Sequence, residues 1–244
     1  MTARRSELLR RLKSTIPPET RRAIRARVAR LDRARWGNLR RFEPFSDHYG
    51  FERGTPVDRF YIERFLADHA RDIRGKVLEV GQAHYARAFP GSSPGEVDIV
   101  DNDERNPVAT IIADLSEGNS LPSGRFDCFI LTQTLQLVAD LEGALQNAWQ
   151  CLAGGGVLLI SMPAITRADA EYASTDRWRV TPSGLETVLA RTCSGARREV
   201  VGYGNLTSAV AFLMGLAAEE LEESELAVTD PHFSVVVCAW VQKH

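Results

Sequence analysis

The sequence lacks the features of a secreted, membrane-spanning or disulfide-stabilised protein. Its longest apolar run, residues 209–218, is about half of the roughly 20 residues that cross a bilayer. The arginines that begin at Arg4 are not followed by the apolar segment of a secretion signal. The four cysteines are scattered, without CxxC spacing or a nearby histidine cluster, which predicts reduced core residues and identifies no metal site. We therefore expect a cytoplasmic protein.

The sequence also lacks the full glycine-rich loop that normally follows the first strand of a nucleotide-binding α/β domain. Residues 76–89, "KVLEVGQAHYARAF", contain an apolar run, Glu79 and Gly81, but the next glycines are absent. This absence argues against a nicotinamide-dependent oxidoreductase, which usually needs a G-x-G-x-x-G turn. Gly81 still permits a tight turn and a close approach of the backbone to a ligand.

Charge is distributed unevenly along the chain. Residues 1–41 contain 14 basic and three acidic residues, so this arm carries +11 and the remainder −13. Apolar residues at helical spacing, interrupted by Pro17 and Pro18, predict two short amphipathic helices in the arm. Such helices bind anionic membranes, nucleic acid or a protein partner, or pack on their own domain or a second subunit. No aromatic side chain stands among the arginines before Trp36, which disfavours nucleic acid.

Residues 42–244 have the pattern of one α/β domain that begins with a lid or cap segment at 42–74. Apolar strand-like runs alternate with helical segments, which predicts a doubly wound parallel sheet with helices on both faces. A long connection before the last strand predicts that this strand is antiparallel. The expected strands are 77–80, 97–100, 109–112, 128–131, 157–161, 198–203 and 233–241. The expected later helices are 140–152, ending in the glycines 154–156, and 206–221.

Residues after four of these strands have the order that an adenosine-containing ligand requires at the carboxyl edge of such a sheet. A glycine turn above an acid comes first, then an acid for the ribose hydroxyls, an acid for the adenine amine, and a polar pair after the fourth strand. Each acid alone is equally typical of a helix N-cap. These candidates are Glu79, Gly81, Asp98 or Asp101, Asp114, Leu115, Thr132 and Gln133.

Longer strings resemble class I S-adenosylmethionine-dependent methyltransferases, from about Phe42 to the C-terminus. They are "DHYGFERGTPVDRFYIERFL", "NPVATIIADL", "FDCFILTQTLQLVADL", "GGGVLLISMP" and "DRWRVT". More narrowly, they resemble a bacterial group associated with glycosyltransferases and with glycan or natural-product biosynthesis. The resemblance implies a seven-stranded Rossmann-like sheet with an antiparallel last strand, S-adenosyl-L-methionine as cofactor, and a homodimer or a glycosyltransferase partner.

That group is similar to this sequence in lacking the full glycine loop and in placing an aromatic residue where Tyr85 stands. We expect Gly81 alone to provide the close approach, while Gln82, His84 or Tyr85 contacts the methionine end of the cofactor. The alternative, in which His84 and Tyr85 only cap a following helix, stays open.

The predicted reaction is O-methylation of a sugar hydroxyl or of a glycosylated metabolite. A general base would accept the hydroxyl proton. His48, with Asp47 beside it in the lid, is the first candidate and His84 the second. Candidates for binding a small-molecule or glycan acceptor are Tyr49, Trp178, Arg179 and, for an acidic or phosphorylated acceptor, Arg59.

Two alternative functions remain. A nucleic-acid methyltransferase would use the basic arm, although the rest of the chain is acidic and has no Asn-Pro-Pro-aromatic motif for a flipped base. A non-catalytic binding or scaffold protein would keep the fold without the glycine loop, since fold does not establish activity.

Overall fold

The computed structural model describes residues 17, 20 and 37–244. The chain divides into two units, Met1–Phe42 and Glu43–His244. In the first unit, the described part contains one 3-10 turn, Gly37–Leu39. The amphipathic helices expected in residues 1–41 lie almost wholly outside the described residues. Membrane contact and a protein partner for this arm therefore stay predictions.

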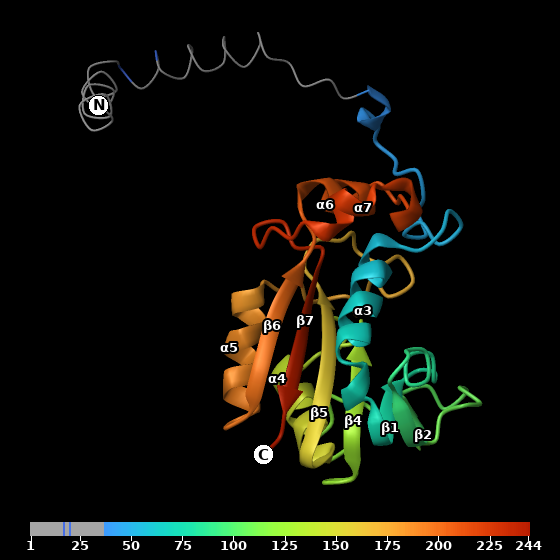
Figure 1. Ribbon diagram of the computed structural model, residues 1–244, viewed down its shortest axis with the longest axis vertical. Helices are drawn as coiled ribbons and strands as arrows, with labels where there is room; N and C mark the ends of the chain where they lie inside the picture. The colour runs from blue at the N-terminus through green and yellow to red at the C-terminus, as the bar shows by residue number, and fades with distance from the viewer. Residues whose placement is uncertain (1–16, 18–19, 21–36) are drawn as a thin grey trace. The chain divides into compact units, whose positions relative to one another are not determined.

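The second unit is built on a seven-stranded sheet of order β3-β2-β1-β4-β5-β7-β6 (Figure 1). Six strands run in one direction, and β7 is antiparallel to both of its neighbours, β5 and β6. The predicted Rossmann-like sheet with an antiparallel last strand is confirmed. The strands are β1 Arg74–Val80, β2 Ser93–Asp101, β3 Ile111–Ile112, β4 Phe126–Thr132, β5 Leu152–Pro163, β6 Arg197–Tyr203 and β7 Val236–Gln242.

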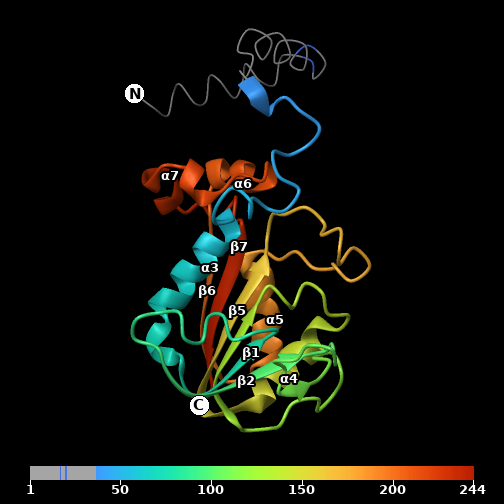
Figure 2. The same cartoon turned by 90° about the vertical axis from the view of Figure 1, so that its right-hand side faces the viewer.

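Helices cover both faces of the sheet because its central strands are apolar on both sides. In β4, Cys128 and Ile130 pack into one hydrophobic cluster, whereas Phe129 and Leu131 pack into the other. Helices α3 (Val57–Asp68) and α6 (Leu206–Leu213) contribute to the first cluster, and α4 (Leu141–Cys151) and α5 (Pro182–Thr192) to the second. Figure 2 shows α3 on one side of the sheet and α4 and α5 on the other.

The regular alternation of strands and helices predicted from the sequence is wrong for the first half of the domain. Within residues 74–132, the connections between β1, β2, β3 and β4 contain turns and bends but no helix. The glycines 154–156 do not end a helix either, because β5 already begins at Leu152. Asp140 does begin α4, since its side chain accepts a hydrogen bond from the N–H of Gly143 at 3.0 Å.

The helix expected at 206–221 is also shorter than predicted. Helix α6 ends at Leu213, and Gly215 follows with a φ of +69°. A side chain at this position would collide with the backbone of Ser46, so only glycine fits the turn. The chain then continues into the short helices η3 (Ala218–Glu220) and α7 (Glu223–Ala227) before β7.

The described residues contain neither a helix that could span a membrane nor a cluster that could hold a metal ion. Among residues 37–244, no helix combines the length and the apolar character that a span requires. In the same part of the chain, no three His, Cys, Asp or Glu side chains gather in a way that could hold a metal ion. All four cysteines are reduced and buried, as predicted.

Candidate active site

The loop after β1 takes its shape from one buried carboxylate. Glu79, which is 2% exposed, accepts hydrogen bonds from the backbone N–H groups of His84 at 3.0 Å, Tyr85 at 2.8 Å and Ala86 at 2.9 Å. Burial raises the pKa of Glu79, and the three N–H groups oppose this rise because they stabilise the ionised form. The capped-helix alternative for His84 and Tyr85 is wrong, since the loop 81–92 contains no helix.

Gly81 makes the turn that leads from β1 into this loop. Its φ is +75°, and no atom lies within 4 Å of the place where a Cβ would stand. Its carbonyl oxygen accepts a hydrogen bond at 2.7 Å from the side chain of Asn106, which also donates to Asp101 at 2.6 Å. A ligand can therefore approach the backbone of Gly81 directly, beside the carboxylate of Asp101.

The two acids proposed for the ribose lie in different surroundings. Asp101 is the last residue of β2, next to the Gly81 turn. Asp98 lies three residues earlier, and its carboxylate is engaged by Arg125 at 2.7 Å and by Thr110 at 2.9 Å. The structure thus brings Asp101, rather than Asp98, to the strand end where a ribose would lie.

The pair predicted for the adenine lies after β3. Asp114 is exposed and accepts a hydrogen bond from the N–H of Ser116 at 2.8 Å. Leu115 is 6% exposed, and its side chain packs in the hydrophobic cluster that α4 covers. Neither residue lines the larger cavity described next.

A cavity of about 730 Å³ lies at the carboxyl ends of β1 and β4. Its size falls within the roughly 300–1,000 Å³ of small-molecule sites. We call it the larger cavity. It brings together most of the predicted cofactor residues with several residues from α3 and the segment before it. Its polar and aromatic lining residues are Phe51, Thr55, Arg59, Glu63, Glu79, Gln82, His84, Tyr85, Thr132, Gln133 and Tyr172.

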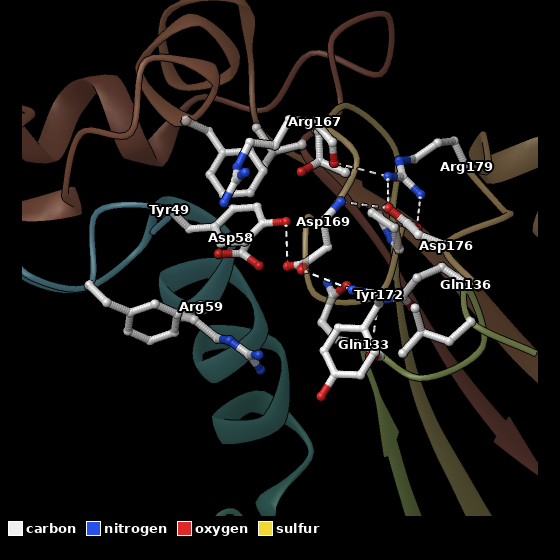
Figure 3. Close-up of a pocket in the computed structure, with 16 residues that line it drawn as sticks. Tyr49, Asp58, Arg59, Gln133, Gln136, Arg167, Asp169, Tyr172, Asp176 and Arg179 are labelled. Carbon is white, nitrogen blue, oxygen red and sulfur yellow. Dashed lines mark hydrogen bonds and ion pairs between the residues drawn. The ribbon is translucent and has the colours of Figure 1, made fainter. Parts of the chain in front are cut away.

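A second cavity of about 210 Å³, the smaller cavity, shares a wall with the first (Figure 3). The shared wall consists of Phe51, Arg59, Gln133 and Tyr172. The remaining side chains come from the beginning of α3 and the segment before it, the segment after β4, the end of β5, the loop 164–181, α6 and the residue before β7. Those labelled in Figure 3 are Tyr49, Asp58, Gln136, Arg167, Asp169, Asp176 and Arg179.

Hydrogen bonds hold the loop 164–181 over the smaller cavity. The Tyr49 hydroxyl donates to Asp169 at 2.8 Å, and the Asp169 N–H donates to Asp176 at 3.0 Å. Arg179 forms an ion pair with Asp176 at 2.6 Å and lowers the pKa of that carboxyl. The guanidinium of Arg167 lies 4.3 Å from the centre of the Tyr49 ring.

The smaller cavity also concentrates backbone strain and unpaired polar atoms. Tyr49 and Gln133, with φ of 59° and 45°, are two of the three non-glycine residues with positive φ in the described chain. Among the residues that the structure describes, the Gln136 Oε1 and Arg167 Nε atoms are buried without a hydrogen-bond partner. Strain and unsatisfied polar atoms cluster at functional sites, so these features indicate a binding site.

Asp58 is the acid that sequence reasoning missed. It lies in the first turn of α3 and lines the smaller cavity. Burial raises the pKa of its carboxyl, and the neighbouring Arg59 opposes this rise only in part. In the sequence, Asp58 reads as an ordinary acid at a helix beginning. Its raised pKa inside a cavity is instead the signature of a candidate general base.

The structure places the predicted general bases elsewhere. The side chains of Asp47 and His48 are 83% and 80% exposed and line neither cavity. Their turn is fixed by Ser46, whose hydroxyl accepts hydrogen bonds from the N–H groups of His48 and Gly50, both at 3.0 Å. His84 lines the larger cavity but is exposed.

Of the four residues predicted to bind the acceptor, three line the smaller cavity and one does not. Tyr49, Arg59 and Arg179 line the smaller cavity, as Figure 3 shows. Trp178 lines neither cavity, because its indole N–H is bound to the carbonyl of Val138 at 2.9 Å.

Comparisons with known proteins agree with this geometry. Residues 91–160 match the family model described as a methyltransferase domain. No curated protein matches the chain. An S-adenosylmethionine-dependent methyltransferase from Mesorhizobium loti is 16% identical, with a TM-score of 0.50, over 77% of this chain and 98% of that one. The CurJ carbon methyltransferase is 16% identical, with a TM-score of 0.51, over 80% and 57%. The N-methyltransferase NodS from Bradyrhizobium japonicum, in complex with S-adenosylhomocysteine, is 14% identical, with a TM-score of 0.49, over 78% and 88%.

The chain therefore has the fold of the S-adenosylmethionine-dependent methyltransferase to which it is similar. The match to a methyltransferase domain agrees with the predicted cofactor, S-adenosyl-L-methionine. The residues present fit this group. The larger cavity has sufficient volume, and the Gly81 turn that lines it is open to a ligand. Asp101 does not line this cavity, but its carboxylate and the Gly81 carbonyl accept hydrogen bonds from the same Asn106 side chain.

The Glu79 contacts lead to a first prediction. Glu79→Ala leaves three backbone N–H groups without their acceptor, so we expect the free energy of unfolding to fall by about 1–3 kcal/mol. The amides of residues 84–86 should also lose protection from hydrogen exchange. Urea denaturation and exchange followed by NMR measure both effects.

The control is Glu96→Ala. Glu96 is 64% exposed and forms an ion pair with Lys76 at 3.1 Å, so its loss should cost no more than about 0.5 kcal/mol. Equal effects of the two substitutions, with unchanged exchange at residues 84–86, would contradict the role of Glu79.

Proposed function

We propose that residues 43–244 form an S-adenosylmethionine-dependent methyltransferase that methylates a hydroxyl group of a sugar or of a glycosylated metabolite. The observation that carries this proposal is the shared wall between the two cavities. One cavity fits the cofactor, and the other is polar and contains Asp58, an acid with a raised pKa.

In this proposal, the cofactor supplies an electrophilic methyl group on its sulfonium. The chain has to hold the acceptor oxygen about 3–3.5 Å from the reacting carbon, which can lower the barrier by roughly 7–11 kcal/mol. Gln133 and Tyr172 stand in the shared wall. The N–H of Gln133 is bound to the carbonyl of Ser161 at 3.0 Å, so its strained backbone is fixed at the end of β4.

The smaller cavity has the chemistry of a site for a hydroxylated ring. Aromatic side chains, among them Tyr49, Tyr172 and Phe212, line it. The buried Gln136 Oε1 can accept a hydrogen bond, and the buried Arg167 Nε–H can donate one. A volume of about 210 Å³ suits a single small ring, so a larger glycan would extend outside.

Asp58 is the proposed general base. Its raised pKa brings the carboxylate closer to the basicity that proton abstraction near neutral pH requires. The Asp58 carboxylate would accept the hydroxyl proton of the acceptor as the methyl group passes from the sulfonium sulfur, which keeps the electron pair of the broken bond, to the acceptor oxygen. Such a base contributes about 10²- to 10⁴-fold in rate.

The second prediction concerns activity. Asp58→Asn should lower kcat for methyl transfer to glycosides by about 10²- to 10⁴-fold, because the base is lost. Binding of S-adenosylhomocysteine should be unchanged. Transfer of a labelled methyl group to a panel of glycosides measures kcat, and calorimetry measures the binding of S-adenosylhomocysteine.

Asp47→Asn and His48→Gln are the matched controls, since both side chains are exposed and line neither cavity. They should keep nearly full activity. Robust transfer to another substrate class, with none to any glycoside, would reject the sugar acceptor. Full activity of Asp58→Asn would reject Asp58 as the base.

The third prediction concerns stability and pH. Because the pKa of Asp58 is raised in the folded chain, its contribution to stability is complete below the pKa of the unfolded chain and is lost as pH rises through the folded pKa. The side chain of the Asp58→Asn variant cannot ionise, so the variant does not lose this stability as pH rises. The variant should therefore be more stable than the wild type at neutral pH, and the difference should shrink towards about pH 4. Urea unfolding at several pH values tests this, and parallel profiles would contradict it.

A further inference from the structure

The larger cavity contains a pair of opposite charges that the reaction itself does not use. Arg59 and Glu63 are four residues apart in α3, so they lie on the same face of the helix, and both line the larger cavity. Arg59 is the one Arg or Lys among the lining residues that the structure describes. Both residues are half-buried.

We propose that Arg59 and Glu63 bind the zwitterionic amino-acid end of the cofactor, Arg59 its carboxylate and Glu63 its ammonium group. This inference rests on the proposed function. It assigns to α3 the anchoring of the methionine moiety, which in this chain cannot come from a glycine-rich loop after β1.

The arginine is already held in place by the β1 loop. Its Nη1 donates a hydrogen bond at 3.2 Å to the hydroxyl of Tyr85, a residue that is 5% exposed. Tyr85 in turn owes its position to Glu79, which accepts the hydrogen bond from its N–H. The guanidinium retains further donors for a carboxylate, to which it can bind in bidentate fashion.

The other charged groups of the larger cavity do not offer the same function. The carboxylate of Glu79 is engaged by three backbone N–H groups. Glu79 is also 2% exposed, whereas Glu63 is half-buried and lines the larger cavity. An incoming carboxylate would thus meet Arg59, and an incoming ammonium group would meet Glu63.

The assignment also changes the expectation for the acceptor. Arg59 was predicted to bind an acidic or phosphorylated acceptor, but a cofactor carboxylate would neutralise it. Asp58, Asp169 and Asp176 would then face only Arg167 and Arg179 in the smaller cavity. This excess of acid favours an uncharged acceptor such as a neutral sugar.

The fourth prediction compares two ligands that differ in the amino-acid end. S-adenosylhomocysteine carries this end, and 5′-methylthioadenosine lacks it. Arg59→Gln should weaken S-adenosylhomocysteine binding by at least about 10-fold, because a charge-assisted hydrogen bond is lost. Its affinity for 5′-methylthioadenosine should equal that of the wild type. Glu63→Gln should show the same selectivity, and Arg59→Lys should restore part of the affinity. Calorimetric titration of the full chain measures all of these.

Arg64→Gln is the matched control, because Arg64 is exposed on the same helix and lines neither cavity. It should leave both affinities unchanged. Equal weakening of both ligands by Arg59→Gln, or no weakening of either, would overturn the inference alone. A wild-type chain that binds neither ligand would overturn the proposed function and the inference with it.

Discussion

The buried carboxylate of Glu79 accepts hydrogen bonds from three consecutive backbone N–H groups, and the rest of the site depends on this constraint. It shapes the loop after β1 without a helix and without further glycines. It also fixes Tyr85, which holds Arg59 at the wall between the two cavities. Gly81 is left with one task, which is to keep the backbone open to a ligand at the carboxyl end of β1.

Around this fixed loop, segments far apart in the sequence line two adjoining cavities. The beginning of α3 supplies Asp58 and Arg59, the end of β4 supplies Gln133, and the loop 164–181 supplies Tyr172. Gln133, whose backbone is strained, belongs to the wall that the larger and the smaller cavity share. Such a division is what a direct transfer between two bound molecules requires.

The sheet was predictable from the sequence, because buried parallel strands leave continuous apolar runs. The position of Glu79 and Gly81 at the end of the first strand followed from the same pattern. Asp58 was not predictable, since its raised pKa comes from burial by segments distant in sequence. Sequence reasoning favoured His48, with Asp47 beside it in the lid segment, but both side chains are exposed. The surroundings of a group, rather than its type, decide its basicity.

The most direct test of this account is a crystal structure of the chain with S-adenosylhomocysteine. The account predicts that the ligand occupies the larger cavity, with its amino-acid end beside Arg59 and Glu63 and its sulfur facing the shared wall of Gln133 and Tyr172. A ligand bound elsewhere, or one whose sulfur faces away from the smaller cavity, would contradict it.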